Sequence, residues 1–269
     1  MTLPSLDPTG ERRPRLVGEL ALITGSTSGI GRAIALEFAA EGARVVVHGR
    51  DATRGEAVTA EARSLGGDAT FVTADLADPA AVDALIARTV DALGGLTVLV
   101  NNAVGATNGR DSRVADMDLA HWESAFLVNL TAPMLLCRAA LPHMLTAGHG
   151  AIVNVSSRQA ERPSPGLAAY AASKGGLNAL TRAIAVEYAD HDIRANTLSP
   201  GYVINDRRDA EMDDARRARL EAMHLTRLGN ARDAAFAAVY LASRESGFLT
   251  GINLQLDGGS SIGRASSFG

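Results

Sequence analysis

Short apolar runs alternate along the chain with longer segments in which apolar positions recur at helical spacing. Most of the short runs are continuous, as in "ARVVVHG" and "LTVLVNNA", and this is typical of strands that are buried on both faces. The pattern predicts seven strands, at residues 19–25, 43–49, 69–75, 96–103, 150–157, 193–200 and 252–259.

The segments between these runs predict helices. In "GIGRAIALEFAAEG", residues Ile30, Ile34 and Phe38 form an apolar stripe. Further helices are predicted at 51–67, 79–95, 118–147, 168–190 and 231–243. Strands that alternate with helices are joined by right-handed crossovers into a parallel sheet with helices on both faces. The sequence therefore predicts an α/β fold: one doubly wound domain at 17–269, after a flexible leader at 1–16.

The composition excludes several classes of function. With 46% hydrophobic residues, 21% charged residues and a net charge of −4, the chain does not favour a nucleic-acid or anionic-membrane surface. No apolar run approaches the roughly 20 residues of a membrane span, and no secretory signal opens the chain. The single cysteine, Cys137, suits a reducing cytoplasm. The six histidines have no metal-ligand spacing, so no metal site is expected.

The segment "TGSTSGIG" joins the first predicted strand to the first predicted helix. Glycines at such a turn allow a tight bend, close approach of a pyrophosphate to the backbone, and close packing of helix on strand. The helix N-terminus then offers free N–H groups to the anion. We therefore interpret this turn as part of a dinucleotide site, with Gly25, Ser26, Thr27, Ser28, Gly29, Ile30 and Gly31 as its residues.

The end of the second strand, "RVVVHGRD", bears on the choice of dinucleotide. An NAD site usually places an acid there to bind the ribose 2′-hydroxyl, whereas a 2′-phosphate needs a cation. Gly49 stands where the acid is expected and Arg50 follows it, while Asp51 is placed to cap the next helix. This pattern favours NADP(H), with NAD as the alternative.

The stretch "YAASK" contains the only lysine of the chain, Lys174, and every other basic residue is arginine. A lysine carries a compact ammonium whose pKa a protein can adjust. Positions i and i+4 share a helix face, so Lys174 can lie beside Tyr170. A phenol with a pKa around 10 is a reluctant acid or base at neutral pH, and we expect a nearby ammonium to lower that pKa.

The glycine turn, "NNA" (101–103), Asn129, "NVSS" (154–157), "YAASK" and "SPG" (199–201) occur in this order, and through them the chain resembles the short-chain dehydrogenase/reductase family over residues 17–260. The resemblance implies a Rossmann-type domain whose seven parallel strands have the order 3-2-1-4-5-6-7. It also implies hydride transfer between a nicotinamide and a carbonyl or alcohol, and assembly as a homotetramer or homodimer.

Four positions match the catalytic residues of the family. The resemblance makes Tyr170 the general acid/base, and it makes Ser157, thirteen residues earlier, the partner of the substrate oxygen. Lys174 would contact the phenol and the ribose hydroxyls, and Asn129 would hold a water that links Lys174 to solvent. The remaining matches imply cofactor contacts: Asp75 and Leu76 to the adenine, Asn102 to a ribose, and Val203, after Pro200 and Gly201, to the nicotinamide carboxamide.

Three positions depart from the family pattern. Val104 follows "NNA" where the family usually has glycine, and Asn205 stands where a threonine would contact the carboxamide. Ser28 replaces the cation that many NADP enzymes carry before the second turn glycine, which keeps NAD as an alternative.

The sequence thus predicts an NADP(H)-dependent oxidoreductase that acts on a ketone, aldehyde or secondary alcohol. The alternatives are an NAD-dependent dehydrogenase of the same fold and a catalytically silent dinucleotide-binding regulator, although a silent protein has no need of all four catalytic matches. Substrate contacts are expected from 105–113, from 158–168 and from a mobile lid at 205–229. The identity of the substrate is not indicated.

Overall fold

A sheet of seven parallel strands forms the centre of the computed structural model, which describes residues 14–105, 111–205 and 208–263. The strand order is β3-β2-β1-β4-β5-β6-β7. The strands are β1 (Leu20–Ile23), β2 (Arg44–Gly49), β3 (Asp68–Thr73), β4 (Val98–Asn101), β5 (Gly150–Val155), β6 (Ile193–Pro200) and β7 (Asn253–Leu256). The predicted doubly wound α/β fold and the strand order implied by the family resemblance are confirmed.

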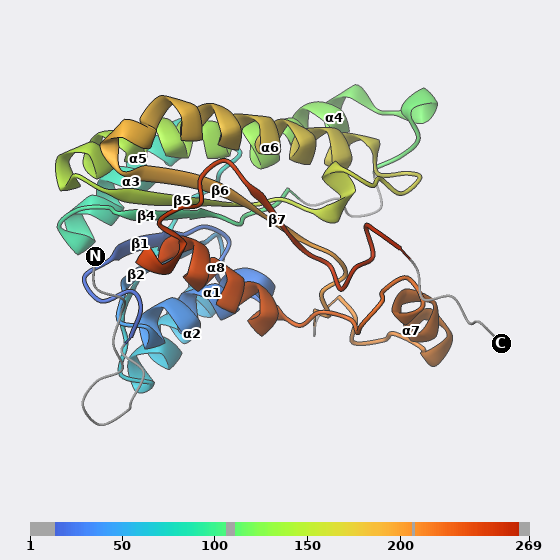
Figure 1. The fold of residues 1–269 in the computed structure, drawn as a ribbon, viewed down its shortest axis with the longest axis horizontal. Coiled ribbons are helices and arrows are strands. Elements are labelled where there is room, and N and C mark those ends of the chain that lie inside the picture. Colours follow the sequence, from blue (N-terminus) through green and yellow to red (C-terminus); the bar gives the residue numbers. More distant parts are fainter. Residues whose placement is uncertain (1–13, 106–110, 206–207, 264–269) are drawn as a thin grey trace.

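Helices cover both faces of this sheet (Figure 1). One layer holds α1 (Gly29–Ala40), α2 (Ala52–Ser64) and α8 (Ala231–Ala242), and the other holds α3 (Pro79–Leu93), α5 (Ala132–Ala147) and α6 (Ala168–Tyr188). Successive residues of β2 enter opposite cores, because Val45 and Val47 pack with the first layer and Val46 packs with the second. This double burial explains why the strands read as continuous apolar runs.

Side chains just before the helices fix where several of them begin. Asp51 accepts a hydrogen bond from the backbone N–H of Arg54 at the start of α2, and Asp78 accepts one from Ala80 at the start of α3. Asn230 and Asp233 form a reciprocal capping box at the start of α8. The prediction that Asp51 caps a helix is therefore confirmed.

The predicted helix at 118–147 is continuous but changes its winding. It consists of α4 (Leu119–Phe126), a π-helical turn at Leu127–Thr131, and α5. By length and composition alone, Leu119–Ala147 would suffice to cross a membrane, which differs from the expectation that no run approaches a span. Leu136 and Met144 of α5 are fully buried in the second core, so this segment serves as a core helix of the domain.

The domain begins earlier than the predicted boundary at residue 17. The backbone N–H and side chain of Arg15 bond to the carboxylate of Glu41, and Leu16 is fully buried in the first core. Two residues assigned to the flexible leader are therefore held in the fold, and the rest of that leader, 1–13, lies outside the described residues.

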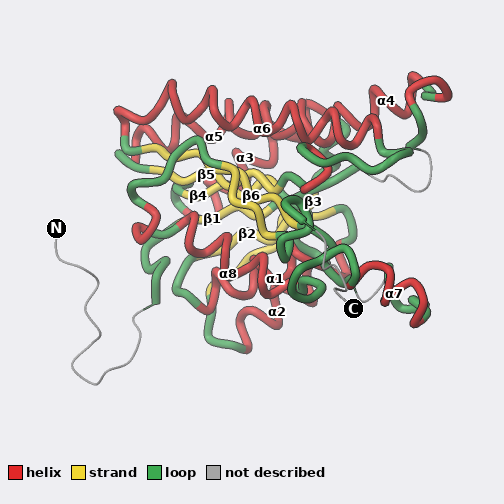
Figure 2. Tube along the Cα trace, turned by 45° about the vertical axis from the view of Figure 1, so that its right-hand side comes forward, coloured by secondary structure: helices red, strands yellow, loops and turns green. Residues whose placement is uncertain are grey.

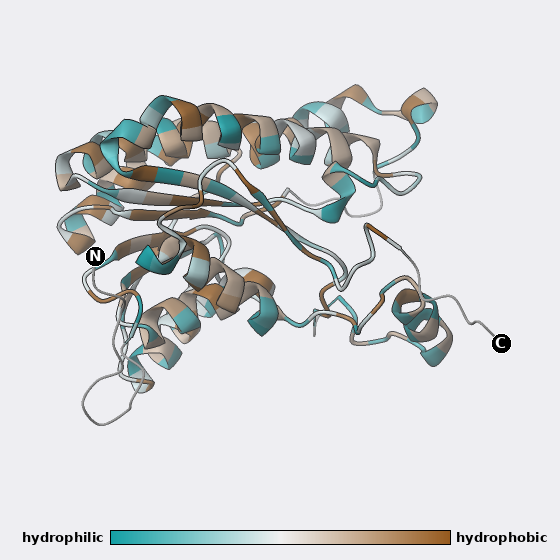
Figure 3. Ribbon diagram, viewed as in Figure 1, coloured by the Kyte–Doolittle hydropathy of each residue, from teal (hydrophilic) through white to brown (hydrophobic). Residues whose placement is uncertain are grey.

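The predicted lid leaves the sheet after β6 and returns to its own starting point. Ile204 donates a backbone hydrogen bond to Gly229, and Gly229 donates one to Tyr202, so the two ends of the excursion are joined. Its helix α7 (Asp214–Glu221) buries no residue and stands apart from the two helical layers (Figure 2). Hydrophobic and hydrophilic residues are interspersed along the covering helices (Figure 3).

Candidate functional site

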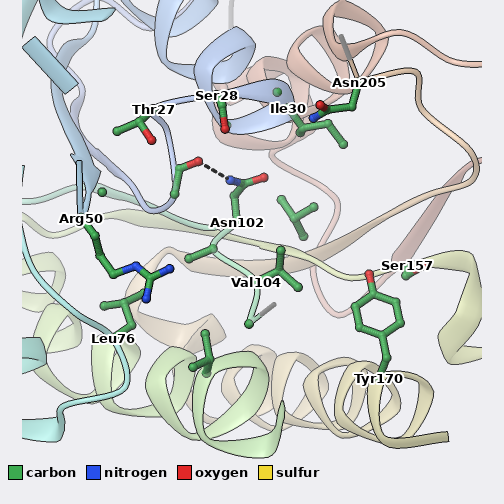
Figure 4. A pocket seen from close by; sticks show the side chains of 18 of the residues that line it. Thr27, Ser28, Ile30, Arg50, Leu76, Asn102, Val104, Ser157, Tyr170 and Asn205 are labelled. Atoms are coloured by element: carbon green, nitrogen blue, oxygen red, sulfur yellow. Dashed lines mark hydrogen bonds between the residues drawn. The ribbon is translucent and has the colours of Figure 1, made fainter. Parts of the chain in front are cut away.

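A cavity of about 970 Å³ opens along the carboxyl ends of the central strands. At one end lie the glycine turn and Arg50, and at the other lie Ser157 and Tyr170 (Figure 4). The cavity is lined by every predicted site residue except Ser26 and Asn129. The fold thus assembles residues that are up to 178 positions apart, from Gly25 to Val203, because parallel strands carry their carboxyl ends to one edge of the sheet.

The glycine turn is shaped by two left-handed residues and one close contact. Gly25 and Gly29 have φ of 63° and 55°, a region that glycine enters without a steric penalty. A Cβ at Gly31 would collide with the amide nitrogen of Asn102 and with the carbonyl oxygen of Gly25. Glycine is therefore required at all three positions by the backbone itself.

The N-terminus of α1 is open to an anion. Ser28 is its N-cap residue, but the Ser28 side chain makes no capping hydrogen bond, and the first turn of α1 contains no acidic residue. The first N–H groups of the helix thus lack the acceptor that an N-cap serine usually supplies. Since Ser28, Gly29 and Ile30 line the cavity, this partial positive charge faces into it.

The Ser26 side chain points from the turn toward strands β1 and β2 and does not face the cavity. It is fully buried, and its hydroxyl donates to the carbonyl oxygen of Ile23 at 2.7 Å and accepts from the N–H of His48 at 2.9 Å. The prediction that Ser26 lines the dinucleotide site is wrong for its side chain, because the turn directs the hydroxyl into the sheet.

His48 also supports the turn, and the sequence did not single it out. Its Nδ1 accepts from the N–H of Gly25 at 3.2 Å, and its Nε2 lies 3.3 Å from the carbonyl oxygen of Ala74. These partners place the proton on Nε2. Burial lowers the pKa of His48 to about 4. The ring is therefore neutral at pH 7, and Nδ1 keeps the lone pair that accepts the N–H of Gly25.

Arg50 and Asp75 face each other at one mouth of the cavity. Nη1 of Arg50 lies 3.8 Å from Oδ2 of Asp75, and the Arg50 side chain is 74% exposed. An exposed pair of this kind is weak, so the guanidinium remains available to a ligand. At Gly49, an added Cβ would lie 2.5 Å from Cγ2 of Thr27.

Asn102 ties β4 to the glycine turn. Its Nδ2 donates to the carbonyl oxygens of Thr24 at 2.9 Å and Gly25 at 3.1 Å, and Figure 4 shows its side chain beneath the turn. Both amide N–H groups are used by these bonds, so a ribose contact made by this side chain would have to use Oδ1.

Ser157 and Tyr170 meet at the other end of the cavity, where the phenol points toward the serine (Figure 4). Burial raises the pKa of Tyr170, while the hydrogen bond to Ser157 and the positive charge of Arg208 act to lower it. The expectation that Lys174 lowers this pKa below its ordinary value is wrong in this structure. Desolvation of the phenolate outweighs the favourable contacts.

Lys174 is buried beneath Tyr170. Its Nζ lies 5.9 Å from the centroid of the phenol ring and donates to the carbonyl oxygen of Val155 at 2.8 Å. Burial lowers the pKa of Lys174 to about 8. The ammonium is therefore mostly protonated at pH 7, with two N–H groups beyond the Val155 bond. The hydroxyl of Ser156, the residue before Ser157, donates to the backbone carbonyl oxygen of Lys174 at 3.3 Å.

Asn129 lies in the π-helical turn and links two segments of the site. Its Oδ1 accepts from the N–H of Gly105 at 2.9 Å, and its Nδ2 donates to the hydroxyl of Ser173 at 3.1 Å. Single π turns often occur at functional sites. The amide retains one N–H and one lone pair, so the water-holding role of Asn129 stays a prediction.

The catalytic-helix candidate α6 is capped by a residue far away in sequence. Its own N-cap residue, Leu167, has no capping side chain. Instead, the carboxylate of Asp111 accepts from the N–H of Ala169 at 3.2 Å and from the N–H of Tyr170 at 2.9 Å. Asp111 lies in the predicted substrate stretch 105–113, of which 106–110 lie outside the described residues. Nothing local in the sequence indicates this contact, because it spans 58 and 59 positions.

We expect Asp111→Ala to lower the free energy of unfolding by about 1–2 kcal/mol, as for the loss of other helix caps, and to lower kcat by misplacing Tyr170. Asp78→Ala removes a comparable cap from α3 and should cost similar stability with unchanged kcat. Denaturant titration and steady-state kinetics measure the two effects. Equal kcat in both variants would show that Asp111 stabilises the fold without positioning the phenol.

Two departures from the family pattern have visible consequences. Val104 is 54% exposed as a residue, and its side chain lies in the cavity between Asn102 and Tyr170 (Figure 4). A Cβ at Gly29 would lie 2.8 Å from Nδ2 of Asn205, so the segment after β6 reaches across the cavity to the glycine turn. Within the described residues, no group of three His, Cys, Asp or Glu side chains is arranged to hold a metal ion.

Comparison with known proteins gives matches along nearly the whole chain. A family model described as enoyl-(acyl carrier protein) reductase matches residues 25–261. The 2,5-dichloro-2,5-cyclohexadiene-1,4-diol dehydrogenase of Sphingobium indicum is 37% identical over 249 residues, which are 93% of this chain and 98% of that protein.

Solved structures agree with these matches. The 3-oxoacyl (acyl-carrier-protein) reductase of Agrobacterium tumefaciens C58, with NADP bound, has a TM-score of 0.86 at 31% identity, over 91% of this chain and 95% of that chain. A 7α-hydroxysteroid dehydrogenase in complex with NADH and 7-oxo glycochenodeoxycholic acid also has a TM-score of 0.86 at 31% identity, over 92% and 96% of the two chains. With the strand order and the matching motifs, these similarities show that the chain belongs to the short-chain dehydrogenase/reductase family.

Proposed function

We propose that this protein is an oxidoreductase that transfers a hydride between NADP(H) and a carbonyl or secondary alcohol. The observation that carries the proposal is the cavity itself, which has the uncapped N-terminus of α1 at one end and the Ser157–Tyr170 pair at the other. An extended dinucleotide laid between them would bring its nicotinamide to the phenol. The NADP and NADH bound to the structural relatives support this class of cofactor.

The residues of the cavity suit such a cofactor. The N–H groups of α1 would receive the pyrophosphate, and the three turn glycines leave room for its close approach. Asp75 and Leu76 would border the adenine, Asn102 a ribose, and Pro200, Gly201 and Val203 the nicotinamide. The bound nicotinamide would supply or accept the hydride, and all proton handling would belong to the protein.

In the direction of reduction, Tyr170 would donate its phenolic proton to the carbonyl oxygen while Ser157 holds that oxygen. The raised pKa of Tyr170 suits a donor that stays protonated at neutral pH. Lys174, mostly an ammonium at that pH, would bond ribose hydroxyls through its two remaining N–H groups. Proton return from solvent would pass near Asn129.

The test is a screen of ketones, aldehydes and secondary alcohols for oxidation of NADPH and NADH or for the reverse reaction. The expected result is turnover of at least one compound by the wild-type protein, with a kcat about 10²-fold or more lower in Tyr170→Phe. Dinucleotide binding without turnover of any compound would favour the silent regulator instead.

The preference for NADPH is proposed from Arg50 and Gly49. No carboxylate stands at position 49 to repel a 2′-phosphate, and the exposed Arg50 guanidinium can turn from Asp75 to bind it. We expect Arg50→Ala to weaken NADPH binding about tenfold or more and to leave NADH binding unchanged. Fluorescence titration of both nucleotides measures this.

Gly49→Asp should reverse the preference, and the structure provides its control. Any side chain at position 49 presses on Thr27, so Gly49→Ala measures the steric effect without the charge. Tighter binding of NADH by the wild-type protein would contradict the preference and favour the NAD-dependent alternative.

We further propose a cytoplasmic location and a homotetramer or homodimer. The assembly rests on the family resemblance and on exposed apolar side chains of described helices, among them Met134 and Phe236.

A further inference from the structure

Arg208 places a guanidinium at the wall of the cavity, beside Val203. It belongs to the segment that follows β6, and it lines the cavity together with Ser157, Tyr170 and Val203. The sequence holds many arginines in its predicted substrate stretches and does not indicate which of them face inward. Of the arginines in the described part of the lid, Arg208 is the one that lines the cavity.

The Arg208 side chain is held in place by a buried carboxylate. Its Nε donates to Oδ1 of Asp209 at 3.1 Å, and its Nη2 donates to Oδ2 of Asp209 and to the carbonyl oxygen of Val203, each at 2.8 Å. The guanidinium carbon lies 4.7 Å from the centroid of the Tyr202 ring. Because Asp209 holds the guanidinium through Nε and Nη2 and the Tyr202 ring lies against its plane, the side chain loses little further conformational entropy when it binds a ligand.

Asp209 is in turn fixed from other directions. Its side chain is only 1% exposed, and it accepts from the hydroxyl of Tyr202 at 2.6 Å and from the N–H of Asn205 at 2.9 Å. Neither Asp209 nor Tyr202 lines the cavity. The buried carboxylate therefore holds the guanidinium, which is about half exposed, at the wall of the cavity.

The bonds to Asp209 and Val203 use Nε and Nη2, so the N–H groups of Nη1 are left for an acceptor in the cavity. Arg208 lines the same cavity as Tyr170, and its positive charge acts to lower the pKa of the phenol. The same segment approaches the glycine turn, since the N–H of Arg208 donates to Oδ1 of Asn205, and Nδ2 of Asn205 lies beside Gly29. The pyrophosphate of a dinucleotide, however, would already be received by the N–H groups at the start of α1. An anion at Arg208 is thus best explained as part of the substrate.

We propose that Arg208 binds a carboxylate of the substrate, so that the compound reduced at Tyr170 is an oxo acid rather than a neutral ketone. This rests on the proposed oxidoreductase function. A carboxylate complements the charge of the guanidinium and can accept a charge-assisted hydrogen bond from Nη1. The Asp209 carboxylate does not repel the substrate carboxylate strongly, because its charge is already neutralised by Nε and Nη2 of Arg208.

The experiment compares oxo acids of increasing chain length with their methyl esters, which differ only in the charge. For the wild-type protein with NADPH, kcat/KM should favour the acid of a matched pair by about ten- to a hundredfold. Arg208→Gln should remove that preference by lowering kcat/KM for the acid alone. Arg219→Gln, an exposed arginine of α7, should retain it, and circular dichroism checks that each variant is folded.

A binding measurement separates this proposal from the proposed function. Calorimetry with Tyr170→Phe and NADPH records binding of acid and ester without turnover, and the acid should bind more tightly unless Arg208→Gln is added. A higher KM for NADPH in Arg208→Gln with an unchanged acid-to-ester ratio would overturn the proposal in favour of a cofactor contact. An equal loss for acid and ester, a preference for the ester, or no binding of any acid would also overturn it.

Discussion

Replacing Tyr170 with Phe is expected to lower kcat by about 10²–10⁴-fold, the usual range for loss of a general acid. The phenol is the group that the fold presents at the end of the cavity beside Ser157. Phenylalanine keeps the ring and its packing, so only the proton donor is removed. Stopped-flow or steady-state oxidation of NADPH with the best carbonyl compound measures the loss.

Cofactor binding by Tyr170→Phe should stay close to that of the wild-type protein, because the uncapped N-terminus of α1 and Arg50 are untouched. Ser157→Ala serves as a companion variant, since it removes the partner of the phenol without removing the donor. Substantial turnover by Tyr170→Phe would contradict the assignment of Tyr170 as the general acid.

Lys174→Arg is expected to be nearly as damaging as Lys174→Ala, with kcat lower by about 10²-fold or more. Lys174 is 2% exposed, and its ammonium fits between Tyr170 and the carbonyl oxygen of Val155. A guanidinium is larger and planar, and it would carry five N–H groups into a space that satisfies one. Burying it there costs stability or displaces the phenol.

The pH dependence distinguishes this role from packing alone. Burial lowers the pKa of Lys174 from 10.5 to about 8, so the lysine is charged below pH 8 and becomes neutral as pH rises above it. Wild-type cofactor affinity should fall above pH 8, whereas an arginine stays charged over that range. An arginine variant that works at the wild-type rate at all pH values would refute the special role of the lysine.

The fold could be predicted from the sequence because its signals are local. A continuous apolar run such as that of β2 indicates burial on both faces. Asp51 indicates the start of a helix, because its hydrogen-bond partner Arg54 is only three residues away. The glycine turn was also predictable, since the φ values of Gly25 and Gly29 are properties of single residues. Motif order then fixed the family, and the strand order that it implied is the observed one.

The direction of individual side chains was not predictable in this way. Ser26 lies in the turn but points into the sheet, and Lys174 points to the carbonyl oxygen of Val155. Burial also raises the pKa of the neighbouring Tyr170 phenol. Both outcomes depend on the local dielectric and on partners from other strands. The pattern of residues along the sequence contains no information on the local dielectric or on partners from distant strands.

The sequence by itself determined the layers, the open helix N-terminus and the spacing of Ser157, Tyr170 and Lys174. Only the tertiary structure decided that Asp111 caps α6 and that Arg208, paired with Asp209, lines the cavity. The physical reason is distance along the chain: local patterns fix backbone conformation and burial, whereas long-range partners are chosen when the packed sheet brings separate loops to the same edge.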